Sequence, residues 1–274
     1  MSWLHQLTQR TALFWAIILL VSTPTPAQAQ WWWPPSWFRQ RSNWGPASGN
    51  YTGAAQRGGS CGKVPVPLTA LAPFYQAEDG QQYVLGATAS DYPILWFYLP
   101  YEIGTAATNL TPKNSTQPIA ELRLEEQDPK TQRSFQRTVL ELPATKPGVI
   151  GIPLPRREPA LIVGKTYHWL LVVRCDPSDA STNQFAELSL HRVQPPVPLS
   201  SIATAPPRQQ LSFYVQNGLW SETMTLCDRI QRASGDPDLL TEWSKIIESV
   251  PLNGIMAQQV VAECRAGKQK ILPQ

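Results

Sequence analysis

The chain has 274 residues and a formal net charge of +3 at pH 7, from 23 lysines and arginines against 20 aspartates and glutamates. This small excess excludes the strongly basic class of nucleic-acid-binding proteins, so no nucleic acid is expected as a partner. The length allows one or two domains with hydrophobic cores, and 27 prolines with only 16% charged residues favour strands and loops over a helical bundle.

The first 29 residues have the three parts of a secretory signal peptide. A weakly positive start precedes an apolar run at 11–21, and prolines end that run. Ala27 and Ala29 place small residues at the two positions that signal peptidase reads, so we expect cleavage before Gln30. An uncleaved anchor is the alternative, but a run of about 11 residues is shorter than the ~20 that span a bilayer. We expect the product in the periplasm, at the cell surface or outside the cell.

All four cysteines, Cys61, Cys175, Cys227 and Cys264, lie beyond the predicted cleavage site. An even number in an oxidising compartment indicates two disulfides. Of the possible pairings we favour Cys61 with Cys175 and Cys227 with Cys264, because each pair then falls within one predicted domain. No pair has the short spacing of a zinc or redox motif, and we expect neither a metal nor another cofactor.

Residues 30–62 differ in composition from the rest and are predicted to form a flexible arm. They begin with Trp31, Trp32, Trp33 and Trp37 among prolines and arginines, and they end in a stretch rich in Gly, Ser and Ala. In one interpretation these tryptophans anchor the chain at a membrane surface or on a cell-wall glycan. In the other the segment is a linker whose aromatic side chains pack against the next domain.

Short strand-like runs separated by turn residues fill 63–193. The predicted strands are 64–71, 82–87, 94–101, 119–126, 135–142, 149–154, 166–175 and 184–193. Apolar and polar residues alternate, as at 120–125, which is typical of a sheet with one face in water. About seven or eight such strands predict an antiparallel immunoglobulin-like β-sandwich. The runs 94–99 and 167–173 are apolar on both faces and are expected to be central strands.

The remainder is predicted to be helical. Residues 194–203 form a proline-rich linker, 204–265 a small domain of about four short amphipathic helices, and 266–274 a disordered tail. We expect Thr204 to cap the first helix and Asp236 to cap the third, which has the clearest apolar stripe. The hairpins that these short helices are predicted to form resemble a degenerate tetratricopeptide unit, although the match covers barely one repeat.

His168 is the most prominent candidate for catalysis, since a hydrolase would pair it with Asp176 or Glu187 and a serine. Its place within a predicted strand favours a buried, hydrogen-bonded histidine instead. His191 is expected at the surface. No motif of a known catalytic class accompanies these residues, so we expect a protein without enzymatic activity, with a hydrolase based on His168 as the third alternative.

Three further aromatic residues have two interpretations. Tyr98 and Tyr101 lie in a cluster at a strand end, and Trp220 lies at a predicted helical hairpin. Core packing explains such residues. The alternative is that they line a groove for a peptide or a glycan.

Short motifs occur in a fixed order between residues 58 and 265. They are Gly58-Gly59-Ser60-Cys61, Leu68-Thr69-Ala70-Leu71-Ala72-Pro73, Trp96-Phe97-Tyr98-Leu99-Pro100-Tyr101, Gly164-Lys165-Thr166-Tyr167-His168-Trp169, Cys175-Asp176-Pro177 and Asn217-Gly218-Leu219-Trp220. Their order resembles a family of exported cyanobacterial proteins, domain of unknown function 928 (DUF928). The resemblance implies an exported cyanobacterial protein with a β-rich domain and a helical tail, and it implies no catalytic residues.

We therefore expect a non-enzymatic protein–protein interaction module of the cell envelope, whose partner is another envelope protein. Binding of carbohydrate or cell wall through exposed aromatic residues is the second hypothesis.

Overall fold

The computed structural model describes residues 61–76, 82–104, 117–127, 134–176, 178–233, 236–249, 252 and 254–273. All of these belong to one unit of the chain, Trp33–Gln274. The predicted signal peptide and the arm with its four tryptophans lie outside the described residues.

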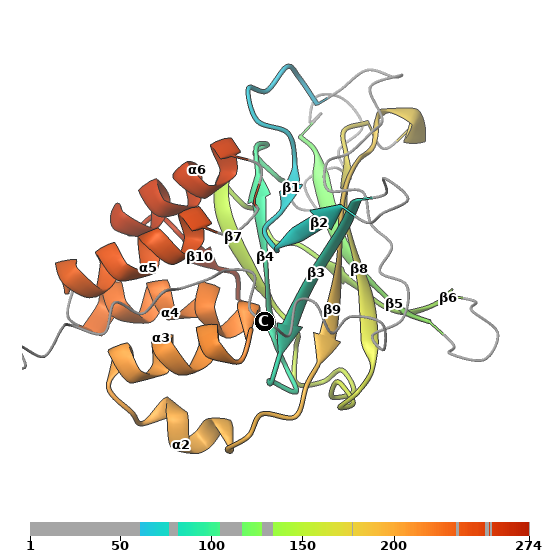
Figure 1. Cartoon of the computed structure of the whole chain (residues 1–274). Helices are drawn as coiled ribbons and strands as arrows, with labels where there is room; N and C mark the ends of the chain where they lie inside the picture. The colour runs from blue at the N-terminus through green and yellow to red at the C-terminus, as the bar shows by residue number, and fades with distance from the viewer. Residues whose placement is uncertain are drawn as a thin grey trace, which may run out of the picture. The chain divides into compact units, whose positions relative to one another are not determined.

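Within the described ranges the strands form two sheets (Figure 1). A four-stranded sheet has the order β1-β4-β7-β10, and a six-stranded sheet has the order β2-β3-β9-β8-β5-β6. The strands are β1 Thr69–Ala70, β2 Phe74–Gln76, β3 Gln82–Thr88, β4 Ile94–Leu99, β5 Ile119–Gln127, β6 Ser134–Glu141, β7 Gly148–Pro153, β8 Thr166–Arg174, β9 Gln184–Arg192 and β10 Lys270–Ile271.

Strands β3 to β9 lie close to their predicted bounds, whereas three short strands differ from the prediction. The first strand is much shorter than 64–71, and β2 has too few residues to show an alternating pattern. Strand β10 lies in the segment expected to be a disordered tail, where it pairs with β7. The tail therefore adds an edge to the four-stranded sheet.

The expectation of purely antiparallel sheets is wrong for two pairs. Strand β3 pairs with β9 in parallel, and β10 pairs with β7 in parallel. Parallel neighbours need a long crossover rather than a hairpin, and both pairs join segments that are far apart in the sequence. All other pairs are antiparallel within the described residues.

The hydrophobic core follows the predicted alternation. In β5, Leu122 and Leu124 are fully buried, and in β8 the same holds for Tyr167, Trp169 and Leu171. Strands β4 and β8 both have neighbours on each side, which confirms that the two strands with two apolar faces are interior ones.

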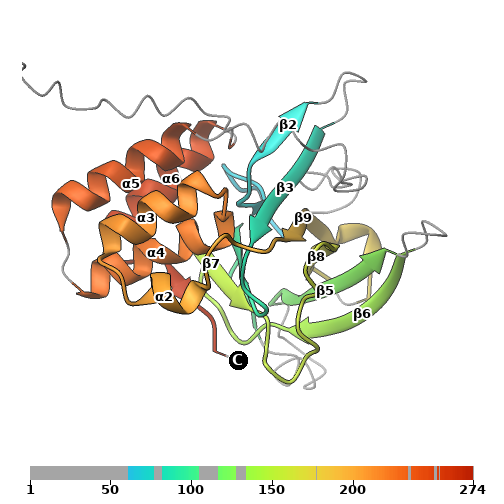
Figure 2. The ribbon, with the colours of Figure 1, turned by 60° about the horizontal axis from the view of Figure 1, so that its bottom comes forward.

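Helices occupy the chain between β9 and β10, and both views show them gathered on one side of the sheets (Figures 1 and 2). They are α2 Leu199–Ala203, α3 Pro207–Gln216, α4 Trp220–Ala233, α5 Pro237–Ser249 and α6 Gly254–Arg265. Helix α4 contacts β3 and β4, and α6 contacts β7. No described helix has both the length and the apolar character needed to cross a bilayer.

Of the two predicted N-terminal caps, one is confirmed and one is wrong. Asp236 caps α5, since its Oδ1 accepts hydrogen bonds from the amides of Asp238 (3.0 Å) and Leu239 (3.2 Å). The expected cap at Thr204 is wrong, because this residue ends α2, a helix within the predicted linker. Pro206 precedes α3 instead, without a side-chain cap.

Two disulfides are present, Cys61–Cys175 and Cys227–Cys264. This is the pairing that the division into two domains favoured. The first ties the segment before β1 to the end of β8, and the second ties α4 to α6. Both are consistent with an oxidising environment.

Candidate functional site

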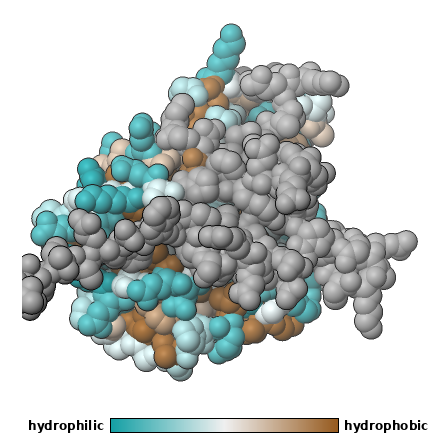
Figure 3. Space-filling model, viewed as in Figure 1, coloured by the Kyte–Doolittle hydropathy of each residue, from teal (hydrophilic) through white to brown (hydrophobic). Residues whose placement is uncertain are grey.

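A cleft of about 200 Å³ opens where the β3–β4 connection meets helices α2, α3 and α4. Its apolar walls are Pro93, Ile94, Leu199, Ala203, Tyr214 and Leu226. Apolar side chains also reach the surface around α2 in the space-filling view (Figure 3). Because Glu222 lies at its inner end, we call it the Glu222 cleft.

One stripe of α4 supplies the polar side of the Glu222 cleft. Glu222, Thr225, Leu226 and Arg229 all line it, and their spacing of three, four and seven residues places them on one face of a helix. A different face of α4, which includes Met224, Cys227 and Ile230, belongs to the core. The helix therefore serves the core and the cleft at once.

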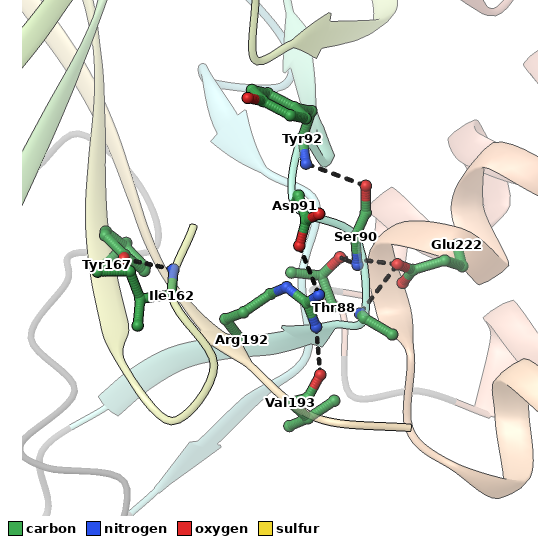
Figure 4. Close-up of polar contacts among 10 residues, drawn as sticks. Thr88, Ser90, Asp91, Tyr92, Ile162, Tyr167, Arg192, Val193 and Glu222 are labelled. Atoms are coloured by element: carbon green, nitrogen blue, oxygen red, sulfur yellow. Dashed lines mark hydrogen bonds and ion pairs between the residues drawn. The ribbon is translucent and has the colours of Figure 1, made fainter. Parts of the chain in front are cut away.

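Glu222 is held at the end of β3 by two hydrogen bonds (Figure 4). Its Oε1 accepts from the hydroxyl of Thr88 at 2.7 Å and from the amide of Ala89 at 3.0 Å. The Thr88 oxygen in turn accepts from the amide of Ser90 at 3.0 Å. These bonds join the sheet to the helices at the inner end of the cleft.

The second carboxyl oxygen of Glu222 is buried and has no hydrogen-bond partner within the described ranges. Burial raises the pKa of Glu222, and the bonds from Thr88 and Ala89 oppose this only in part. The raised pKa favours an uncharged carboxyl. Oε1 accepts both hydrogen bonds, so Oε2 is the oxygen that would carry the proton.

The loop that forms one wall is fixed from β9 (Figure 4). Arg192 pairs with Asp91 at 2.7 Å and also donates to the carbonyl of Val193. The amide of Val193 donates to the carbonyl of Thr88 at 2.9 Å. The wall is therefore preorganised, which reduces the entropy lost when a ligand binds.

Strand β4 supports the cleft from the core side. The hydroxyl of Ser221 donates to the carbonyl of Ile94 at 2.8 Å. The indole of Trp96 donates to the hydroxyl of Thr225 at 3.3 Å. The first turns of α4 are thus bonded to β4 as well as to β3.

Arg229 lines the cleft, and Arg156 lies beside Tyr92, which also lines it. Arg229 is exposed and donates to the side-chain oxygen of Gln210. The guanidinium of Arg156 lies over the ring of Tyr92, 5.4 Å from its centre. Neither arginine has an ion-pair partner in the part of the chain that the structure describes, so the rim carries positive charge.

A second group of titratable residues lies on the six-stranded sheet, away from the Glu222 cleft. His168 on β8 stands between Glu125 on β5 and Glu187 on β9, with nitrogen–oxygen distances of 3.6 Å and 3.5 Å. Burial alone would lower the pKa of His168, but the two carboxylates outweigh it and raise the pKa. The expected partner Glu187 is therefore present, whereas Asp176 bonds to Ser178 instead.

The expectation about one histidine is wrong. The buried Nε2 of His168 faces Glu187 at 3.5 Å without ideal hydrogen-bond geometry, which leaves the expectation for His168 in place. His191 is not at the surface: it is 7% exposed, and its Nδ1 lies 2.8 Å from the Thr166 hydroxyl. Strand β9 lies between β3 and β8, which places His191 inside the sheet rather than at an edge.

The aromatic candidates belong mostly to the core. Tyr101 is 6% and Trp220 is 5% exposed, and the Trp220 indole donates to the carbonyl of Leu71 at 2.6 Å. Their burial favours core packing, the first of the two interpretations of these residues. Tyr98 is half-buried, and burial together with the nearby Glu263 raises its pKa.

The sequence did not identify Glu222, Arg229 or Thr88 as functional. The signal was present in α4, where a second stripe at helical spacing carries a carboxylate and an arginine beside the core stripe. No three His, Cys, Asp or Glu side chains in the described ranges are grouped so that they could hold a metal ion.

The comparisons with known proteins add a family. A family model described as Domain of Unknown Function (DUF928) matches residues 52–260, a range that includes both walls of the Glu222 cleft. Comparisons with curated proteins and with solved structures found no match. The match covers most of the chain, and the protein therefore belongs to the DUF928 family.

Proposed function

We propose that this chain is a non-enzymatic protein-binding module of the cell envelope, and that a partner protein inserts one side chain into the Glu222 cleft. The observation that carries the proposal is the size of the cleft. Its volume of about 200 Å³ lies below the ~300 Å³ at which sites for drug-sized ligands begin. A cavity of about 150 Å³ already accepts a benzene ring. The cleft therefore suits a single anchoring side chain, the usual centre of a protein interface.

The fold supports a recognition role. We place the sheets in the immunoglobulin-like class and the helices in a degenerate tetratricopeptide-like class, both of which present grooves and edges to partners. The α3–α4 hairpin supports the second assignment, since Gly218 joins the two helices with a φ of 66°. Proteins with similar folds have many different functions, so the fold alone does not establish a binding role, and the proposal depends on the cleft itself.

We also propose that the partner is another envelope protein, in the periplasm or at the cell surface. Two disulfides and the predicted signal peptide support this compartment.

The test blocks the cleft without disturbing the core. Ala203 lines the cleft and is exposed on α2, so Ala203→Trp should fill the cleft while the chain still folds. Ser200→Trp is the matched control, because Ser200 is exposed on the same helix and does not line the cleft. Tagged chains are purified from the host envelope, and recovered proteins are identified by mass spectrometry.

We expect one partner to be recovered with the wild type and with Ser200→Trp, and to be lost with Ala203→Trp. Recovery of the same partner with all three chains would show that binding occurs elsewhere. Failure of the wild type to retain any partner reproducibly would remove the support for a binding module.

A further inference from the structure

We infer that the segment bound by the Glu222 cleft is an acidic peptide, with one large apolar side chain in the cleft and Asp or Glu residues beside it that pair with Arg229 and Arg156. This inference rests on the proposed function and adds the chemistry of the partner.

The interior of the cleft selects an apolar anchor. Ile94, Leu199 and Leu226 present aliphatic side chains, and Pro93 closes the wall beside them. The carboxyl of Glu222 does not disturb this environment, because its Oε2 is covered and its Oε1 is already bonded to Thr88. A leucine, isoleucine, methionine or phenylalanine gains free energy by leaving water for such walls.

The rim selects negative charge. Arg229 lies at the outer end of the α4 stripe, and Arg156 lies over the ring of Tyr92, a residue that lines the cleft. The neighbouring acids are engaged elsewhere: Asp91 is paired with Arg192, and Glu222 accepts hydrogen bonds from Thr88 and Ala89. A peptide that crosses the cleft therefore passes two guanidinium groups that have no ion-pair partner among the described residues. Such groups bind carboxylates through forked hydrogen bonds.

The expected contribution of each charge is modest. An exposed pair of this kind changes affinity by up to about fivefold. A lysine or arginine in the same place would meet like charge and bind more weakly. Charge at the rim thus sets the preference among peptides, while the apolar anchor supplies most of the affinity.

A concave site argues for a peptide rather than a membrane. Anionic lipid headgroups would also attract Arg229 and Arg156. A flat bilayer, however, cannot place a group inside a cleft whose walls come from α2, α3 and the β3–β4 loop. Vesicles are therefore included in the test as the competing outcome.

The experiment is a selection from a random-peptide display library on the chain 30–274, with parallel selections on Ala203→Trp and Ser200→Trp. We expect enriched peptides that share one large apolar residue flanked by Asp or Glu. These peptides should bind Ser200→Trp as they bind the wild type, and they should lose at least about tenfold in affinity on Ala203→Trp.

Charge reversal provides the decisive arm. A second selection on Arg156→Glu/Arg229→Glu should replace Asp and Glu in the enriched peptides by Lys and Arg, while the apolar anchor stays. Because Arg229 also bonds to Gln210, the glutamine variants Arg156→Gln and Arg229→Gln are measured too. Each variant should lower the affinity for the acidic peptides by up to about fivefold without changing the melting temperature of the chain.

The outcomes separate the two proposals. In one outcome the enriched peptides are neutral or basic and still lose their binding in Ala203→Trp. That result would overturn the acidic preference and leave the binding function intact. Peptides that bind Ala203→Trp with the same affinity as the wild type would overturn both the proposed function and the acidic preference. So would a selection in which no peptide is enriched. Binding to phosphatidylglycerol vesicles that Ala203→Trp does not reduce, without peptide enrichment, would assign the two arginines to a membrane surface.

Discussion

Glu222 at the start of α4 accepts a hydrogen bond of 2.7 Å from the hydroxyl of Thr88 at the end of β3, across 134 positions of sequence. The bond joins the helices to the six-stranded sheet at the inner end of the cleft. The carboxyl that accepts this bond is buried. Any substitution of Glu222 therefore alters both the contact between α4 and β3 and the lining of the cleft.

The first prediction concerns Glu222→Gln and pH. Burial raises the pKa of Glu222 above its ordinary 4.5, so the folded chain holds the proton more tightly than the unfolded chain does. The resulting stability is complete below pH 4.5 and is lost as the pH rises through the folded pKa. Glutamine resembles the protonated acid, so Glu222→Gln should abolish this decline and be at least as stable as the wild type at neutral pH. Urea unfolding over a pH series measures it.

Glu222→Ala is the contrasting variant. It leaves the buried Thr88 hydroxyl and the Ala89 amide without their acceptor, which should lower the free energy of unfolding by about 1–3 kcal/mol. Equal destabilisation by glutamine and alanine would show that the acid is ionised in the folded chain.

The sequence predicted elements whose signal is local. Alternating residues located β5 and β9, and an acidic cap followed by an apolar stripe located α5, because each pattern lies within one element. The cleft depends instead on contacts between distant elements. Glu222 alone resembles any acid in the first turn of a helix, and nothing at Thr88 indicates that α4 will lie against it.

Dependence on contacts between distant elements also explains why the sequence did not identify both carboxylate partners of His168. Its carboxylate neighbours come from two strands, and only the register places Glu125 directly opposite it. That register follows from inward pairs such as Leu122 with Leu171, which neither strand reveals by itself. The sequence therefore suggested Glu187 but not Glu125. The parallel pairing of β3 with β9 was missed for the same reason.

The second prediction concerns His168→Gln. Burial alone would lower the pKa of His168, but Glu187 and Glu125 raise it above 6.5. The ion pairs therefore stabilise the fold fully below pH 6.5, and the stability is lost as the pH rises through the folded pKa. His168→Gln should be less stable than the wild type in mild acid and should lack the decline above pH 6.5. Affinity for the selected peptides should not change.

His191→Gln is a control of opposite sign. Burial lowers the pKa of His191 below 6.5, so its contribution is complete above that pH and is lost as the pH falls. Urea unfolding should therefore show opposite changes of slope for the two variants. Slopes of the same sign would contradict the assignment of either histidine.

The third prediction concerns the disulfides. Cys61–Cys175 closes 114 positions of sequence and Cys227–Cys264 closes 37. Loop-closure entropy gives about 5 kcal/mol for the longer loop and about 4 kcal/mol for the shorter one. We expect both paired alanine variants to unfold at lower urea concentration, and buried Cys227 and Cys264 to lose packing as well. A pair whose removal leaves unfolding unchanged under oxidising conditions would not be cross-linked in solution.

The last prediction concerns Gly151 on β7, which lies opposite Trp96 on β4. A Cβ at this position would lie 2.8 Å from the Ile94 side chain and 3.1 Å from the Trp96 ring. Gly151→Ala should therefore cost about 1–3 kcal/mol of unfolding free energy through overpacking. Ile94 and Trp96 both bond to α4 beneath the cleft, so peptide affinity should fall as well. Gly164→Ala is the control: its Cβ meets no atom of the described residues within 4 Å, and the strain comes from its φ of +83°. Loss of peptide affinity in the control, or its retention in Gly151→Ala, would show that packing beneath α4 does not shape the cleft.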